Sequence, residues 1–363
     1  MSSTPHGVDR WSEAQARDWH AKQPWRVGCN FLPSSAVNQI EMWSAESFDE
    51  ACIDRELGWA AGIGFNSVRV FLHDLVWQRD PDGLMARLER FLAIASSHGI
   101  APLLVFFDDC WHEPQDGPQL APRPGIHNSR WARSPGAQAL RDRRRWDRLE
   151  AYVRAVVTAH AGDARVLGWD VYNEPTNCFL PILERPQPGK AFALLRAAVR
   201  RRAAARDSLA LLDEAFRWVR ASRPEQPVTA GIWFPDRRLE ARLAALSDVV
   251  SFHHYRRAAH LEREIARLRR YGRPLLCTEY MARTQKCLFE THLPIFQREK
   301  IGCWSWGLVD GRSQTKFSWR DRAGGAEPET WFHDVFRADG TPYREEEVAL
   351  LRRLTGVGAR TRV

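Results

Sequence analysis

The chain has 363 residues, of which 44% are hydrophobic and 27% charged, and its formal net charge is +8. A chain of this length buries enough apolar surface to need no disulfide or metal for stability, and its composition excludes disordered and fibrous proteins. No stretch approaches the roughly 18 apolar residues of a membrane-spanning helix, so we expect no membrane contact.

The excess positive charge comes almost entirely from arginine and is spread over predicted helices. No zinc-finger or RNA-binding motif accompanies it, which indicates solvated helix faces and no specific nucleic-acid partner. The first residues lack the apolar centre of a secretory signal, so we expect a cytoplasmic protein. The seven cysteines contain no C-x-x-C pair, which favours reduced, mostly buried thiols. The sixteen tryptophans either fill the core or offer flat indole faces to sugar rings.

Eight apolar, β-rich runs alternate with helical patterns along the chain. The predicted strands are Trp25–Leu32, Phe65–Leu72, Ile100–Phe107, Val166–Tyr172, Pro227–Phe234, Asp248–Tyr255, Pro274–Tyr280 and Gly302–Val309. Several are apolar at consecutive positions, as expected of parallel strands buried on both faces. Eight such units predict an α/β protein with a single (β/α)8 barrel over about residues 24–357, preceded by a short helical extension, in a one-domain chain of residues 1–363.

An open, doubly wound sheet would show the same alternation of strands and helices. The Gly-rich dinucleotide loop that such sheets carry after the first strand is missing, and that strand ends instead in Asn30–Pro33. We therefore favour the barrel and expect no cofactor.

Two local patterns bear on the helices. Ser47 with Glu50 has the spacing of a capping box and predicts a helix that ends at Gly62 to Gly64. A longer helical pattern over residues 191–221 predicts two helices with a break near Arg206–Ser208.

Active sites of this barrel lie at the carboxyl ends of the strands. The fourth strand ends in Asn173-Glu174, and the seventh ends in Thr278-Glu279-Tyr280. Strands four and seven stand on opposite sides of an eight-strand ring, so the two carboxylates face each other across its mouth. A single glutamate at a strand end is often a helix cap or an ion-pair partner. Two opposed carboxylates are the machinery of glycoside hydrolysis, in which one donates a proton and the other attacks or stabilises the anomeric carbon.

The runs WDVYNEP (Trp169–Pro175) and TEY (Thr278–Tyr280) resemble the glycoside hydrolases of clan A, retaining (β/α)8 enzymes that include the family-five cellulases. The resemblance covers nearly the whole barrel. It implies that Glu174 is the acid/base, that Glu279 is the nucleophile, and that Asn173 hydrogen-bonds the 2-hydroxyl of the sugar.

The same resemblance implies further substrate-site residues on strands two and six. Arg69 looks like the clan's arginine beside the nucleophile, where a cation keeps Glu279 ionised; alternatively it is the structural partner of a buried carboxylate. His253 and Tyr255 look like the clan's pair near nucleophile and sugar. His254 points elsewhere, because adjacent residues on a strand face opposite ways, and we therefore expect no metal site.

Aromatic side chains at the rim are candidate sugar platforms. The clan usually has a Trp on strand eight under the sugar; Trp304 and Trp306 share one face of that strand, and we favour Trp306, nearer the rim, with Trp304 packing in the barrel. Trp233 and Trp111 are each either a sugar platform or part of a loop core. Asn30, at the end of the first strand, completes the set of substrate-binding candidates.

The sequence also departs from the family pattern. Family-five cellulases commonly carry a His-Asn pair after strand three, where this chain has Asp108-Asp109; either aspartate grips a sugar hydroxyl or caps the following loop. His73-Asp74 is a second unusual polar pair at the rim. After strand eight, the polar loop 307–315 is placed to close over the site.

The leading hypothesis is a retaining β-glycoside hydrolase that cleaves β-linked oligosaccharides or glycosides by double displacement. The alternatives are a non-catalytic carbohydrate-binding barrel, which would bind without turnover, and a clan A transglycosylase, which uses the same residues.

Overall fold

The computed structural model describes residues 10–177 and 191–357, with the backbone alone over residues 191–202. Eight strands form one sheet, at the positions that the sequence predicts. Their bounds are β1 (Val27–Asn30), β2 (Ser67–Phe71), β3 (Ala101–Asp108), β4 (Gly168–Asn173), β5 (Val228–Thr229), β6 (Val250–His254), β7 (Leu275–Tyr280) and β8 (Gly302–Trp306). All neighbouring strands pair in parallel.

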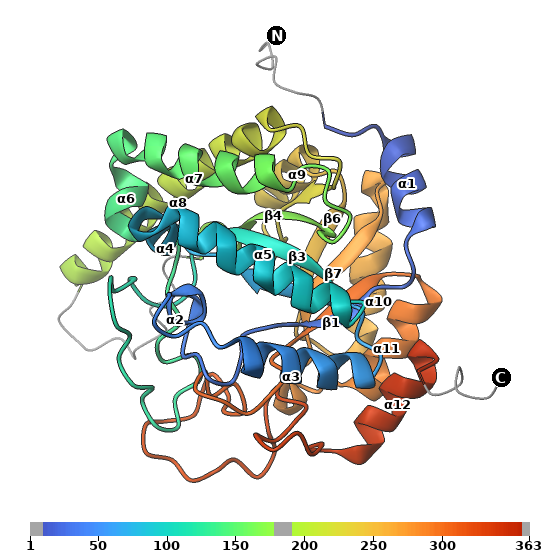
Figure 1. The fold of residues 1–363 in the computed structure, drawn as a ribbon. Helices are drawn as coiled ribbons and strands as arrows, with labels where there is room; N and C mark the ends of the chain where they lie inside the picture. Colours follow the sequence, from blue (N-terminus) through green and yellow to red (C-terminus); the bar gives the residue numbers. More distant parts are fainter. Residues whose placement is uncertain (1–9, 178–190, 358–363) are drawn as a thin grey trace.

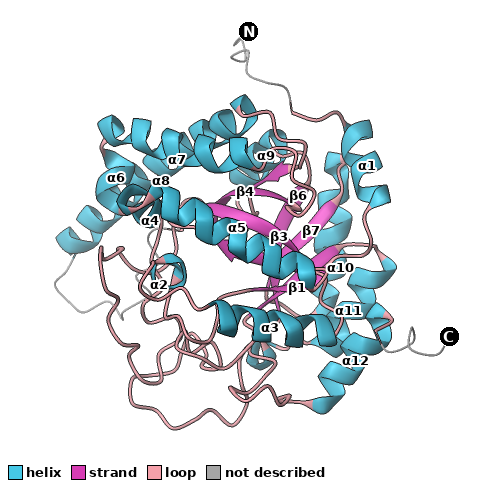
Figure 2. Ribbon diagram, in the orientation of Figure 1, coloured by secondary structure: helices cyan, strands magenta, loops and turns pink. Residues whose placement is uncertain are grey.

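The strand order is β5-β4-β3-β2-β1-β8-β7-β6, and an isolated parallel bridge between Ile232 and Phe252 links the two remaining edges. The sheet is thereby closed into a barrel with helices around its outside, as Figures 1 and 2 show. The predicted (β/α)8 architecture is confirmed. Within the described residues, no helix is long and apolar enough to cross a membrane.

The helices follow the strands in the expected alternation. Their bounds are α1 (Glu13–Lys22), α2 (Gln39–Trp43), α3 (Glu50–Gly62), α4 (Asp74–Arg79), α5 (Pro81–Ser97), α6 (Ala137–Arg141), α7 (Trp146–Ala159), α8 (Ala191–Ala221), α9 (Arg237–Leu246), α10 (Ala258–Leu268), α11 (Phe289–Arg298) and α12 (Glu345–Thr355).

Two helix predictions are wrong in detail. The N-cap of α3 is Asp49, whose carboxylate accepts from the N–H of Cys52, while the Ser47 hydroxyl donates to the carbonyl of Glu41. The predicted break in the long helical region is absent, since α8 is continuous. Ser208 does not interrupt it because its hydroxyl donates to Asp109 across the packed interface and not to the helix's own backbone.

The core has an outer layer between strands and helices and an inner one inside the barrel. At the amino-terminal ends of the strands, Trp304 packs against Leu103, Val249 and Leu276, and Trp19 of α1 covers this cluster from below. The six cysteines within the described ranges are buried, and none of them forms a disulfide. The lower barrel is therefore filled, which leaves the carboxyl-terminal mouth as the place for chemistry.

Candidate active site

Two glutamates face each other at the mouth of the barrel. Glu174 directly follows β4, and Glu279 is the next-to-last residue of β7. One oxygen of each carboxylate and Nδ1 of His253 all lie within 4.8 Å of one another. Nδ1 of His253 is 2.7 Å from Oε1 of Glu174 and 3.5 Å from Oε2 of Glu279. Three strands thus bring two carboxylates and an imidazole to one point.

The backbone at Glu174 is left-handed, with φ at 45°, and that of Thr176 is left-handed too, with φ at 76°. Such conformations cost a non-glycine residue about 1–3 kcal/mol and persist only where the surroundings fix them. Here the Thr176 N–H donates to Oδ2 of Asp109 at 2.7 Å and to Oγ of Ser208 at 2.9 Å. Asp109 is fully buried and also accepts from the Tyr172 hydroxyl. It holds the turn that carries Glu174 and has no surface for a sugar, so it neither grips a sugar hydroxyl nor caps the loop after β3, the two roles predicted from the sequence.

Arg69 on β2 links both carboxylate-bearing strands while fully buried. Its Nη1 donates to Oε1 of Glu279 at 2.8 Å and to Oδ1 of Asn30 at 2.9 Å. Its Nε donates to Oδ2 of Asp170 at 2.9 Å, and its Nη2 donates to Oδ1 of Asn173 at 2.7 Å. Both readings of Arg69 therefore apply: it is the cation beside Glu279 and the partner of a second buried carboxylate. A buried cation is tolerated only with such compensation.

The roles of two residues in this network were not predicted from the sequence. Asp170 was not singled out, although a charged residue within an apolar strand requires a buried partner, and that signal was available. Asn30 was predicted to contact substrate. Its side-chain oxygen instead accepts from Arg69, and its Nδ2 donates to the carbonyls of Thr278 and Ser305. Its place is behind the site, where it orients Arg69.

The surroundings of Glu279 combine burial with several polar contacts. Burial raises its pKa to about 7, with a further contribution from the nearby Glu174, while His253, Arg69 and the Tyr255 hydroxyl oppose the rise. That hydroxyl donates to Oε2 of Glu279 at 2.9 Å. Burial also lowers the pKa of His253 to about 4, so its imidazole is neutral near pH 7.

Glu174 is the more exposed of the two carboxylates, at 14% for its side chain against 6% for Glu279. Its Oε2 accepts from the Cys110 thiol at 3.1 Å and from the amide of Asn177. Burial raises its pKa, and these two donors oppose the rise. Cys110 and Asn177 were missed by the sequence analysis, although Cys110 follows the end of strand three and could have been found by the rim rule. Two buried carboxylates this close each oppose the ionisation of the other.

Asn173 is held in one orientation from two sides. Its carbonyl oxygen accepts from Arg69, and its Nδ2 donates to Oδ1 of Asp108 at 2.9 Å. Asp108 is buried and also accepts from the Trp131 indole N–H at 2.6 Å and from the Cys110 backbone. Asp108 therefore supports Asn173, and the second amide hydrogen of Asn173 has only a long contact, 3.5 Å to the sulfur of Cys110.

The two strand-eight tryptophans occupy different levels of the barrel. Trp304 is fully buried in the lower cluster, and its indole N–H donates to Oγ of Ser67 at 3.1 Å. It cannot reach a substrate and is a packing residue. Trp306 lies at the mouth, 7% exposed, with its ring 5.2 Å from that of Trp131 and 6.0 Å from that of Phe71.

The loop tryptophans are partly exposed. The indole N–H of Trp233 donates to the carbonyl of Pro175, next to Glu174. Trp111 is 37% exposed and lies 5.6 Å from the His127 ring. Trp319, which the sequence analysis missed, is 40% exposed and packs edge-on against Tyr255 at 5.1 Å. The segment after β8 thus places an aromatic side chain beside Tyr255, which donates to Glu279.

The remaining polar pairs at the rim are structural. Nε2 of His73 lies 3.1 Å from the carbonyl of Arg133, and Asp74 accepts from Arg148 and the Ser134 hydroxyl. His254 points away from the site, as predicted, toward Glu264.

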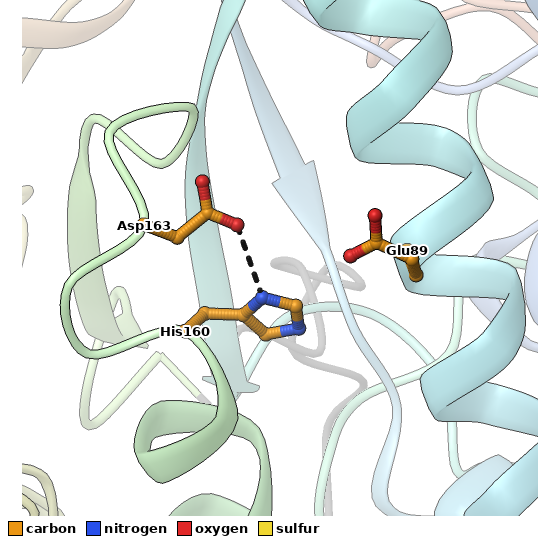
Figure 3. A group of neighbouring side chains, drawn as sticks. All are labelled: Glu89, His160 and Asp163. Atoms are coloured by element: carbon orange, nitrogen blue, oxygen red, sulfur yellow. Dashed lines mark hydrogen bonds and ion pairs between the residues drawn. The ribbon is translucent and has the colours of Figure 1, made fainter.

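Two groups of three possible metal ligands occur among the described residues. One is Glu174, His253 and Glu279. The other, drawn in Figure 3, joins Glu89 of α5 to His160 and Asp163 beyond the end of α7. In this second group Arg165 donates to both oxygens of Glu89 and to Asp163, and its hydrogen bonds lower the pKa of Asp163 to about 2. A guanidinium already compensates these carboxylates, so the group is an ion-pair network.

Comparisons with known proteins found similarity to solved structures alone. No protein-family model matches the chain, and no curated protein matches it. Among solved structures, an exo-β-1,4-mannosidase, Op5Man5 from Opitutaceae bacterium strain TAV5, superimposes with a TM-score of 0.58 at 18% identity. The alignment covers 91% of this chain and 60% of the mannosidase, so the chain spans less than two thirds of that protein.

Two further structures share the fold. A GH5_18 protein from Streptomyces cattleya in complex with Manβ1-4GlcNAc has a TM-score of 0.59 at 16% identity, over 93% of this chain and 81% of its own. A β-1,4-mannanase from the sea hare Aplysia kurodai has a TM-score of 0.52 at 15% identity, over 84% and 95% of the two chains. The chain therefore has the (β/α)8 fold found in these glycosidases.

Proposed function

We propose that the protein is a retaining β-glycoside hydrolase with Glu279 as nucleophile and Glu174 as acid/base. The observation that carries this proposal is the close approach of the two carboxylates, whose nearest oxygens lie within 4.8 Å of each other. Retaining enzymes hold their carboxyl groups about 5–5.5 Å apart, whereas inverting enzymes need about 6.5–9.5 Å to admit a water. The fold shared with glycosidases supports the same class of reaction.

In the first step, Oε2 or Oε1 of Glu279 attacks the anomeric carbon while the bond to the leaving oxygen breaks. Glu174 gives its proton to that oxygen, and a covalent glycosyl ester forms on Glu279. In the second step, Glu174 takes a proton from water, whose oxygen attacks the anomeric carbon and releases Glu279. The two inversions restore the β-configuration.

The distribution of donors supports this assignment of roles. Arg69 and Tyr255 both donate to Glu279, and the charge of Arg69 favours its ionised form. Glu174 lacks a cation in hydrogen-bond contact among the described residues and lies nearer to solvent. We propose that Glu174 is protonated and Glu279 ionised when substrate binds, as the first step requires.

We propose that Asn173 binds the 2-hydroxyl of the sugar through the amide hydrogen not used by Asp108, and that Trp306 contributes to the floor beneath that sugar. The substrate class is β-linked oligosaccharides or glycosides. Because the structural neighbours named above include β-1,4-mannoside enzymes, manno-configured substrates are tested first.

The proposal is tested by mass spectrometry after incubation with activated 2-deoxy-2-fluoro β-glycosides of the manno, gluco, xylo and galacto series. We expect a stoichiometric fluorosugar adduct on the peptide that contains Glu279, displaced slowly by an added acceptor. Binding of oligosaccharide without an adduct or turnover would favour the non-catalytic carbohydrate-binding barrel.

A further inference from the structure

The two carboxylates divide the barrel mouth into two halves. One half is bounded by the ends of β8, β1, β2 and β3, and the other by the ends of β5 and β6. Asn173 turns toward the first half, since its side chain contacts Arg69 of β2 and Asp108 of β3. If Asn173 holds the 2-hydroxyl, as the proposed function requires, the sugar that becomes attached to Glu279 lies in the first half. The leaving group then lies in the second half.

The first half is closed by two loops that are hydrogen-bonded to each other. We call residues 109–136 the β3 loop and residues 307–344 the β8 loop; they run side by side in Figure 1 as the blue-green and orange-red loops. The backbone N–H of Asn128 donates to the carbonyl of Ser313 at 2.9 Å, and the backbone N–H of Gly324 donates to the carbonyl of Pro124 at 2.9 Å. Nδ1 of His127 lies 2.9 Å from the carbonyl of Phe317.

Gln314 is the centre of this junction. Its Oε1 accepts from the N–H of Gly125 at 2.9 Å, and its Nε2 donates to the carbonyls of Arg123 at 2.8 Å and Ile126 at 3.2 Å. Its backbone is left-handed, with φ at 57°, which is a costly conformation for glutamine. The side chain thus fastens the β8 loop to three residues of one short segment of the β3 loop, residues 123–126.

The segment after β1 is hydrogen-bonded to both of these loops. The N–H of Arg312 donates to the carbonyl of Ser34 at 3.0 Å, and its guanidinium pairs with Glu41 at 3.1 Å. Nδ2 of Asn38 donates to the carbonyl of Arg130 in the β3 loop at 2.7 Å. These bonds form a continuous wall, which we call the loop wall: residues 31–41, the β3 loop and the β8 loop.

Little space remains between Trp306 and the loop wall. The cavity there is lined by Trp306, Trp131, Asn128 and Ser313 among others, and its volume is about 20 Å³. This is room for about one water molecule. The loop wall therefore stands directly against Trp306, where the proposed function places the sugar attached to Glu279.

We propose that the loop wall limits the glycone side to a single sugar, so that the enzyme acts from the non-reducing end and releases one monosaccharide per cleavage. This inference rests on the proposed function. The structural neighbours do not decide the point, since they include both an exo-mannosidase and a β-1,4-mannanase. The wall is a feature of this chain's own loops.

The experiment compares open and blocked substrates. The enzyme is incubated with β-1,4-linked manno-, gluco- and xylotetraose labelled at the reducing end, and early products are separated by size. Aryl β-glycosides of the accepted sugar are assayed with and without a 4-O-methyl group. We expect a labelled trisaccharide as the first labelled product and at least a hundredfold lower kcat/KM for the blocked glycoside.

A variant connects this behaviour to the wall. Gln314→Ala removes three of the bonds between the two loops and should raise the ratio of blocked to open kcat/KM at least fivefold. Gln297→Ala, which removes a single bond from an exposed glutamine of α11, is the matched control and should leave the ratio unchanged.

Labelled disaccharide as the first product, or blocked and open glycosides cleaved at similar rates, would overturn the exo assignment while leaving the glycosidase intact. An unchanged ratio in a folded Gln314→Ala protein would overturn the role of the wall. Absence of cleavage on every substrate, together with an unlabelled Glu279, would instead remove the proposed function.

Discussion

Replacing Glu279, the proposed nucleophile, by its neutral isostere glutamine should stabilise the protein while abolishing the proposed activity. A pKa of about 7 for Glu279, against 4.5 for an ordinary glutamate, means that folding disfavours its ionised form. At 1.36 kcal/mol per pH unit, the difference corresponds to about 3 kcal/mol. Glu279→Gln removes this cost and keeps an acceptor oxygen for Arg69.

The gain must depend on pH in a defined direction. Because the folded pKa is raised, the wild-type protein loses stability as the pH rises from about 4 to about 7 and stays at the lower level above that. The stability of the Glu279→Gln variant does not fall in this way, because glutamine does not ionise. We expect it to exceed the wild type by about 2–3 kcal/mol at pH 8 and by less than about 1 kcal/mol at pH 5.

Urea unfolding at the two pH values measures this difference, with m-values compared to ensure that the unfolded states match. For a domain of this size, about 3 kcal/mol corresponds to a rise in Tm of about 4 °C. The exposed Glu46→Gln serves as the control and should match the wild type at both values. A Glu279→Gln protein no more stable than wild type at pH 8, or equally favoured at both pH values, would refute the reasoning.

Three further substitutions test the roles of residues around the carboxylates. Glu174→Ala should retain the first step for activated aryl glycosides, with turnover restored by azide; equal losses for good and poor leaving groups would exclude the acid/base role. Cys110→Ala removes a hydrogen-bond donor to ionised Glu174, so the pKa of Glu174 should rise. The basic limb of the kcat/KM profile should then move to higher pH by about half a pH unit, whereas that of Cys110→Ser should stay near the wild type. Identical basic limbs in the two variants would contradict this positioning role. Tyr255→Phe removes a donor to Glu279 and should move the acidic limb to higher pH with a loss of about 10- to 100-fold in kcat, and an unmoved acidic limb would count against it.

The sequence predicts the barrel and the opposed carboxylates because both follow from the order of strands. Strand number fixes where a residue lies around the ring, and the end of an apolar run fixes its depth, so Glu174, Glu279 and Arg69 could be placed without knowing any loop. The same rule separated Trp306 at the mouth from Trp304 below it.

What the sequence could not supply are contacts made by loops and by distant helices. Asp109 looked available for a sugar, yet it is covered by Ser208, which lies in α8, 99 residues further along the chain. Trp319 reaches Tyr255 because the β8 loop is fastened elsewhere by Gln314. Such contacts depend on the path of a whole loop, which no local pattern encodes.

The hydrogen bond between Arg69 and Glu279 joins residues 210 positions apart. At ribosomal rates of about 5–20 residues per second, Arg69 is synthesised roughly 10–40 s before its partner. During that interval the arginine can pair with Asp170 once β4 has emerged, but the nascent chain still lacks Glu279, the proposed nucleophile. The second carboxylate that the proposed chemistry requires is therefore added only when the last quarter of the chain is translated.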